Sequence, residues 1–273
     1  MKVFGADGAG DVHINLPDVA EDLTNNMDKL NHFDQWMLQK ISYVVSESER
    51  AFSQFQLGDY GHQIVQCMYG DFCDWYIEIA KREKSEYTDK VLLYALGTQL
   101  QLLHPFMPFV TEKIWHLMNF EGMLVTSIRP TSMTNIPKDY KIAILMDMIT
   151  GWRNLRADQK VRPHEKAHIA VQSNVSFNNF VKDYEHLVKD LVQAESITYH
   201  RDDNDIAEDF VTQLVVDMKI GLKAHREINK KDTLASFEKQ LVEEENFMQG
   251  LRTMLTNPSF ATNASPKIIE EKQ

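Results

Sequence analysis

Two prolines interrupt a helical pattern in the middle of the chain, in the stretch Leu102-Leu103-His104-Pro105-Phe106-Met107-Pro108-Phe109-Val110-Thr111-Glu112-Lys113-Ile114-Trp115. Apolar residues recur at helical spacing before this stretch, from residue 92, and after it, up to residue 117. A proline inside a helix removes a hydrogen bond and clashes with the preceding turn. The stretch therefore predicts two helices that part at Pro105 and Pro108. We expect Phe106 and Phe109 to be wedged into the core beside the break.

Helical spacing also dominates the rest of the first 160 residues. Apolar positions on one helical face indicate further helices over about 33–55, 60–79 and 140–158. Short connections between such helices favour antiparallel neighbours. The predicted fold class is therefore mainly α, with an antiparallel helix bundle over 35–165. An acidic, glycine-marked N-terminal segment over 1–34 precedes it.

The pattern changes twice after the predicted bundle. Strand-like alternation at 168–172, 196–200 and 213–220, with a helical stretch at 177–194, indicates a small α+β subdomain over 166–230. A heptad repeat then predicts a coiled-coil arm over 231–273, on Leu234, Leu241, Met248 and Leu255. Its returning helix, expected to start at Ser265-Pro266, is much shorter than the outgoing one. We therefore expect a truncated arm.

Composition restricts the class of protein. The chain has 273 residues, of which 43% are hydrophobic and 25% charged, as in an ordinary soluble globular protein. It contains no run of about 18 apolar residues, so we expect no membrane span. Two cysteines cannot build a disulfide framework, which favours a cytoplasmic location. The formal net charge of −11 repels phosphate on average, so nucleic-acid binding would need local basic stretches.

Three sequence patterns that could indicate catalysis or metal binding are better explained as ordinary structural features. The glycine-rich residues 5–10 follow no strand and precede no Lys-Ser/Thr, which favours a plain turn over a phosphate loop. Cys67 and Cys73 are six residues apart and face different sides of a helix, which favours two buried structural thiols over a metal site. Three carboxylates share a helical face and are interpreted as polar contacts, namely Asp71, Asp74 and Glu78. The sequence thus predicts no catalytic residue and no metal site.

Two local stretches carry an excess of basic residues. Residues 151–170 contain five Lys or Arg against two Asp or Glu, and residues 217–231 have the same balance. Such cations would neutralise phosphates in a salt-dependent way, whereas charge alone favours a merely solvated surface. We expect Arg153 and Arg156, which share a helical face, to project outward. The candidate nucleic-acid contacts are Arg153, Asn154, Arg156, Lys160, Arg162, Lys166, Arg226, Lys230 and Lys231.

Several motifs resemble the anticodon-binding helical domain of class I aminoacyl-tRNA synthetases. One is the proline-containing stretch quoted first, and the others are Phe33-Asp34-Gln35-Trp36-Met37-Leu38, Asp71-Phe72-Cys73-Asp74-Trp75-Tyr76-Ile77-Glu78 and Arg153-Asn154-Leu155-Arg156-Ala157-Asp158. Segments 255–260 and 264–271 are similar to the coiled-coil tip of the valyl branch. The resemblance extends from about residue 30 onward.

The chain departs from the family pattern at two places. Ser265 separates the alanine and proline of the coiled-coil tip, which usually adjoin. Gly8-Ala9 stands where the family usually has a basic-aromatic pair. Anticodon contacts attributed to that pair are therefore not carried over to this chain.

The resemblance implies a function in binding tRNA. It implies that the chain binds and orients the anticodon stem-loop, of valine tRNA, as the C-terminal region of a valine–tRNA ligase. The His-x-Gly-His and Lys-Met-Ser-Lys-Ser elements of the catalytic domain are absent from the sequence. We therefore expect the chain alone to be inactive and to hold no cofactor, since ATP is used by the missing catalytic half. The expected partners are tRNA and that half, and the expected state is a monomer.

Two alternatives remain at this point. A stand-alone paralogue would act as a protein-interaction or regulatory module through its acidic surface. An enzyme with an unrecognised site would need convergent titratable groups, which the sequence does not display.

Overall fold

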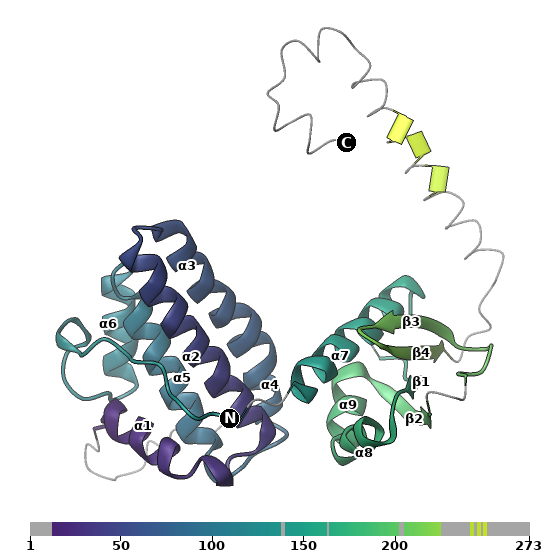
Figure 1. Cartoon of the computed structure of the whole chain (residues 1–273), viewed down its shortest axis with the longest axis horizontal. Coiled ribbons are helices and arrows are strands. Elements are labelled where there is room, and N and C mark those ends of the chain that lie inside the picture. The colour runs from purple at the N-terminus through teal and green to yellow at the C-terminus, as the bar shows by residue number, and fades with distance from the viewer. Residues whose placement is uncertain are drawn as a thin grey trace, which may run out of the picture.

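The structure, a computed structural model, describes residues 13–137, 140–162, 164–201 and 205–224, with short helical pieces at 241–242, 245–246 and 248–249. It consists of a helical lobe and a smaller lobe built on a sheet (Figure 1). The helical lobe contains α1 (Leu16–Asn25), α2 (His32–Ser53), α3 (Leu57–Gln66), η2 (Cys67–Tyr76), α4 (Ile77–Ala80), α5 (Thr88–Leu103) and α6 (Pro108–Leu117), with short 3₁₀ turns η1 (Met27–Lys29) and η3 (Leu124–Thr126). The predicted bundle helices are thus present.

The central helix α2 has well-defined ends. Its N-cap residue Asn31 accepts a hydrogen bond from the backbone N–H of Asp34 at 2.7 Å. Its last turn closes with Phe55 at φ 57°. The N–H of Gln56 then bonds the carbonyl of Ala51 at 2.8 Å, as in a Schellman motif. The helix that follows is continuous from α3 through η2 to α4, and its middle section, η2, has π-helical hydrogen bonding.

The break at the two prolines is confirmed, but the burial of the two phenylalanines is not. Helix α5 ends at Leu103, and α6 begins with Pro108 in its first turn. Phe106 is 47% exposed and Phe109 90% exposed. The first turn of α6, from Pro108 to Val110, is exposed to solvent. Instead, α6 buries Thr111 and Trp115 against the lobe.

The second lobe holds a four-stranded sheet in the order β2-β1-β4-β3. Its strands are β1 (Ala167–Gln172), β2 (Ala194–His200), β3 (Val211–Val215) and β4 (Met218–Ala224), with helices α8 (Val175–Asp183) and α9 (Glu185–Val192) between β1 and β2. Strands β1 and β2 are parallel, and the other pairs are antiparallel. This confirms the α+β subdomain. The single extended run expected at 213–220 is instead a hairpin that turns at Val216, whose φ is 55°.

Helix α7 (Lys141–Asp158) connects the two lobes (Figure 1). It contacts α2, but it packs more extensively on β3 and β4 than on the bundle. Trp152 donates its Nε1 hydrogen to the carbonyl of Gly221 at 3.0 Å. A Cβ added to Gly151 would lie 2.6 Å from Cδ1 of Ile220, so the helix approaches the sheet closely. The helix expected in the bundle therefore packs mainly against the sheet.

Some expectations are not tested by this structure. The domain boundaries after residues 34, 165 and 230 stay predictions. The coiled-coil arm and its truncation lie outside the described residues, apart from the short helical pieces. Within the described part of the chain, no helix is both long and apolar enough to cross a membrane.

Candidate nucleic-acid interface

Arg153 lies where α7 meets the helical lobe. The carbon at the centre of its guanidinium lies 4.9 Å from the centroid of the Trp75 ring in η2. Its Nε donates a hydrogen bond to the carbonyl of Leu191 in α9 at 3.2 Å. Burial and the nearby Arg82 lower the pKa of Arg153, and Asp74 acts in the opposite direction. The side chain stays partly exposed, so a fixed, planar cation remains accessible on an aromatic ring.

Arg156 does not project outward, so the expectation for this residue is wrong. It is 7% exposed. Its guanidinium donates hydrogen bonds to three backbone carbonyls, those of Gln193 at 3.2 Å, Arg162 at 3.0 Å and Glu165 at 2.8 Å. The loop after α7 folds back over this side chain and supplies two of the three acceptors, and the end of α9 supplies the third. Arg156 therefore positions a loop, and its burial keeps it from presenting its guanidinium to a phosphate.

The loop that Arg156 holds presents basic side chains to solvent. The loop starts with a Schellman motif, in which the N–H of Lys160 bonds Ala157 O and that of Val161 bonds Arg156 O, both at 2.9 Å. Lys160 adopts the left-handed conformation of this motif, with φ 52°. The exposed candidates on the end of α7 and on this loop are Asn154, Lys160, Arg162 and Lys166. With Arg153 they form what we call the α7 basic surface.

The second basic stretch is described only in part. Its described lysines, Lys219 and Lys223, form ion pairs with Asp205, at 3.2 Å, and with Asp209. Both lysines are thus already paired with carboxylates. The candidates Arg226, Lys230 and Lys231 lie outside the described residues, so the structure does not place them.

A groove of about 300 Å³, which no pattern in the sequence predicted, lies between α2 and the α3–η2 helix. We call it the α2–η2 groove, and its lining residues are Lys40, Tyr43, Val44, Gln63, Gln66, Cys67, Gly70, Asp71 and Trp75. Lys40 and Asp71 form an ion pair across it at 3.0 Å. One signal was available in the sequence, namely Gly70 among larger residues on the same helical face.

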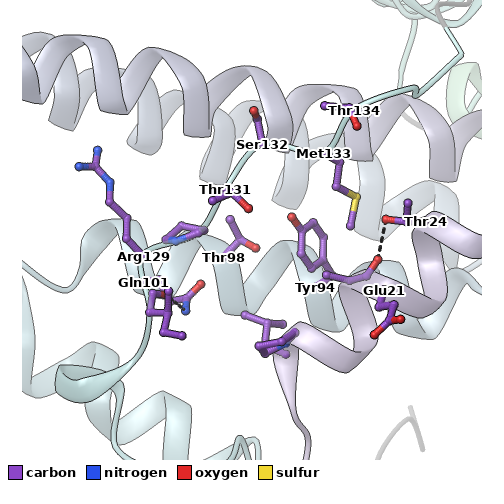
Figure 2. A pocket seen from close by; sticks show the side chains of 15 residues that line it. Glu21, Thr24, Tyr94, Thr98, Gln101, Arg129, Thr131, Ser132, Met133 and Thr134 are labelled. Carbon is purple, nitrogen blue, oxygen red and sulfur yellow. Dashed lines mark hydrogen bonds between the residues drawn. The ribbon is translucent and has the colours of Figure 1, made fainter.

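A larger cavity, of about 440 Å³, is lined by none of the candidate contact residues (Figure 2). It is bounded by α1, α5 and the segment 128–134. Several hydroxyl side chains line it, together with Glu21 and one cation, Arg129. The guanidinium of Arg129 lies 5.2 Å from the centroid of the Phe52 ring. Because no residue of α7 or of its following loop lines this cavity, it is not part of the α7 basic surface.

The described residues include no group of three or more His, Cys, Asp or Glu side chains that could hold a metal ion. Cys67 is buried, and burial raises its pKa to about 12. Cys73 is partly buried, and its pKa is also raised, first by burial and then by Asp74. Both thiols are therefore protonated at neutral pH, and thiolate is the form that binds metals.

Comparison with known proteins places this arrangement in a family. A family model described as the anticodon-binding domain of tRNA ligase matches residues 34–171. The valine–tRNA ligase of Lactobacillus johnsonii is 27% identical over 275 residues, which cover 96% of this chain and 31% of the relative. The valine–tRNA ligase of Streptococcus mutans is 28% identical, and the match covers 89% of this chain and 28% of the relative. That of Aquifex aeolicus is 24% identical, and the match covers 88% of this chain and 22% of the relative. The chain spans less than a third of the length of these relatives. It belongs to the family of tRNA-ligase anticodon-binding domains.

Proposed function

We propose that this chain binds tRNA at the anticodon stem-loop, with valine tRNA as its preferred ligand, and that it uses the α7 basic surface. The observation that carries this proposal is the loop after α7, which Arg156 holds so that Lys160, Arg162 and Lys166 point to solvent. In a domain of this family, exposed cations on a fixed loop are suited to the phosphates of a nucleic acid. The overall charge of −11 makes such a local surface necessary.

The members of the surface have different roles in this proposal. Lys160, Arg162 and Lys166 neutralise phosphates, whereas Arg156 acts as a positioning residue. Arg153 presents a planar guanidinium on which an unstacked base can lie, and Asn154 adds an amide beside it. The cations outside the described residues, Arg226, Lys230 and Lys231, are proposed as further phosphate contacts.

The proposal assigns no chemical step to this chain. Activation of valine with ATP would belong to the rest of a valine–tRNA ligase, and this chain would orient the tRNA for it, as a monomer in the cytoplasm. Pyrophosphate–ATP exchange by the purified chain in the presence of valine would contradict this part of the proposal.

A binding titration tests the proposal. Valine tRNA and a version with a swapped anticodon are titrated with the chain at two salt concentrations. We expect tighter binding of valine tRNA and a linear decrease of log K with log salt. Lys160→Ala and Arg162→Ala should each weaken binding and reduce the slope by about 0.7–0.9. Lys113→Ala, on the exposed side of α6, is the matched control. Equal affinity for the two tRNAs would contradict anticodon recognition, and no binding would contradict the whole proposal.

One observation favours a second function, the binding of a protein partner. Phe55 and Phe109 are 89% and 90% exposed at one end of the helical lobe. The ring of Tyr60 packs near two further aromatic rings. Its centroid lies 6.1 Å from that of Phe52 and 5.3 Å from that of Phe106. Exposed rings on this scale are typical of interaction surfaces. A Phe55→Ser/Phe109→Ser variant distinguishes the two functions, because it should bind tRNA as the wild type does if these rings serve only a protein partner.

A further inference from the structure

The outer strand of the sheet has a row of backbone groups without a partner strand. Strand β3 lies at one edge of the sheet and, among the described strands, pairs only with β4 (Figure 1). Val215 and Met218 close this hairpin, and alternate residues of an antiparallel pair direct their N–H and C=O groups away from the partner strand. In β3 the outward residues are Thr212 and Leu214. The described residues offer neither of them a further backbone hydrogen bond.

Strand β3 lacks the features that usually protect a sheet edge. Charged residues, prolines and bulges commonly prevent an exposed edge from accepting another strand. The five residues Val211–Val215 include no charge and no proline, and their register with β4 is regular. The opposite edge strand, β2, carries the exposed charge of Glu195 and has an irregular register with β1 near its start. The edge of β3 is therefore the one suited to pairing with a further strand.

Exposed aliphatic side chains accompany this edge. Helix α7 covers one face of β3, since Cγ2 of Val215 lies 3.0 Å from a Cβ added to Gly151. Side chains alternate between the two faces of a strand, so Leu214 points to the other face, where it is 73% exposed. Val216, in the turn, is 61% exposed and has φ 55°, which is costly for a β-branched residue. An added strand would thus cover apolar side chains as well as pair its backbone.

The two ends of β3 carry exposed carboxylates. Glu208 precedes the strand, Asp217 lies in the turn after it, and neither forms an ion pair with a described residue. The neighbouring Asp205 and Asp209 are already paired with lysines of β4. A strand with basic residues at its ends would therefore complement this edge electrostatically.

The same charges disfavour a second copy of this chain as the partner. Two copies of β3 paired antiparallel along their whole length would be centred on Gln213. In that register Asp217 of one copy lies opposite Asp209 of the other. Like charges directly opposite each other destabilise a strand pair.

We propose that the edge of β3 binds an extended peptide segment of another protein, with β-branched or apolar residues in its centre and basic residues at its ends. The peptide adds a strand to the sheet, and its backbone pairs with Thr212 and Leu214. Its apolar side chains cover that of Leu214, and its terminal cations lie near Glu208 and Asp217. The inference goes beyond tRNA binding, and it concerns a different surface from the exposed phenylalanines of the helical lobe.

A synthetic peptide tests the inference. The probe is fluorescein-labelled Lys-Lys-Thr-Val-Thr-Val-Thr-Lys-Lys, and fluorescence anisotropy measures its binding to the full chain. The matched control peptide has N-methyl groups on its five central amides, so that it keeps its charge but cannot donate backbone hydrogen bonds. We expect it to bind about 5- to 150-fold more weakly, the equivalent of two lost backbone bonds. Equal binding of both peptides would mean that only the net charge of −11 attracts them, and it would overturn the inference.

A substitution on the strand tests the same contact from the side of the protein. Thr212→Pro removes an outward N–H without removing a bond to β4, because proline is tolerated where the N–H of an edge strand faces solvent. Thr212→Val is the matched control, since it keeps this N–H and the β-branched shape. We expect Thr212→Pro to weaken binding of the unmodified peptide about 2- to 10-fold, and Thr212→Val to leave it unchanged. Equal affinity of the two variants would contradict pairing at this edge.

Hydrogen exchange on the wild-type chain needs no variant to fold. The amides of Thr212 and Leu214 should exchange rapidly in the free chain and become protected when the unmodified peptide is added. Slow exchange in the free chain would show that the edge is already paired, and it would overturn the inference. Sedimentation of the free chain should show no dimer. A dimer that Thr212→Pro dissociates would assign the edge to a second copy and would likewise overturn the peptide assignment.

Discussion

Tyr76 donates its hydroxyl hydrogen to Oδ1 of Asp34 at 2.5 Å, between η2 and the first turn of α2. Ser85 donates to Oδ2 of the same carboxylate at 2.6 Å, and the Thr88 hydroxyl lies 3.1–3.2 Å from both oxygens. Asp34 is fully buried. Burial raises its pKa, and these hydroxyl groups lower it in part. A ring of neutral donors thus stabilises a carboxylate that has lost its contact with water.

The first prediction concerns this hydrogen bond. Tyr76→Phe should lower the free energy of unfolding by about 1.5–3 kcal/mol, because it removes one donor from a buried, charged acceptor. Urea denaturation at pH 7 measures the loss. Tyr69→Phe is the control on the same helix, because Tyr69 is 66% exposed and should tolerate the change. An equal effect at both positions would show that the bond to Asp34 contributes nothing specific.

The second prediction is a pH dependence that originates at Asp34. Because folding raises its pKa, the folded state binds its proton more tightly than the unfolded state does. The resulting stabilisation is present below the unfolded pKa, near 3.8, and is lost as the pH rises through the folded value. The stability of Asp34→Asn relative to wild type should therefore improve as the pH is raised from 4 to 7. Denaturation curves at several pH values test this, and a constant difference would contradict it.

The third prediction separates the two thiols. Cys67 is buried, and its pKa is raised to about 12, so it should resist alkylation in the folded state. Cys73 is partly accessible, so it should react slowly at pH 8. Mass spectrometry after treatment with iodoacetamide should find one labelled cysteine in the native chain and two in urea. Rapid native labelling of a Cys73→Ala variant would mean that Cys67 is accessible after all.

The fourth prediction distinguishes the positioning arginine from a contacting one. Arg156→Lys should cost about 2–4 kcal/mol of stability, because lysine cannot replace a planar group that bonds three carbonyls. Arg162→Ala should change stability by less than about 0.5 kcal/mol, since its side chain is exposed. Thermal melts and salt-dependent tRNA titrations, performed on both variants, should show the stability loss in the first and the reduced slope in the second. A reduced salt slope for Arg156→Lys, with a stability loss for Arg162→Ala, would mean that Arg156 contacts the RNA.

The fifth prediction follows from the exposed end of the helical lobe. A buried phenylalanine would cost about 3–5 kcal/mol on truncation to alanine. Phe109 is 90% exposed, so Phe109→Ala should change the unfolding free energy by about 0.5 kcal/mol at most. A Trp115→Ala variant, at a buried position on the same helix, should lose several times more in the same denaturation assay. A large loss for Phe109→Ala would place its ring in the core.

The sequence predicted those parts of the fold that depend on local stereochemistry. The break between α5 and α6 follows from the prolines themselves, and it is present. Whether the ring of Phe109 is buried or exposed depends on which elements pack beside it, and no local sequence pattern determines that. The turn between β3 and β4 was missed because Val216 is an unusual residue for a left-handed conformation.

The candidate site was predictable only where it depends on residues that are neighbours in the sequence. Its basic residues are adjacent in sequence, so their grouping could be inferred. The burial of Arg156 could not, because one of its acceptors, the carbonyl of Gln193, comes from the far end of α9. The α2–η2 groove lies along a segment with π-helical hydrogen bonding, which the spacing of apolar residues does not reveal.

The absence of a side chain at Gly151 lets α7 lie close to the sheet of the second lobe. Ile220, whose Cδ1 would lie 2.6 Å from an added Cβ, is itself fully buried and has little room to move. A larger residue at position 151 would require the side chain of Ile220, or α7 itself, to shift. Since Arg153 follows two residues later, a shift of α7 would also move its guanidinium relative to the Trp75 ring. Through Gly151 and Arg153, a single helix thus contacts both the sheet and the Trp75 ring of the other lobe.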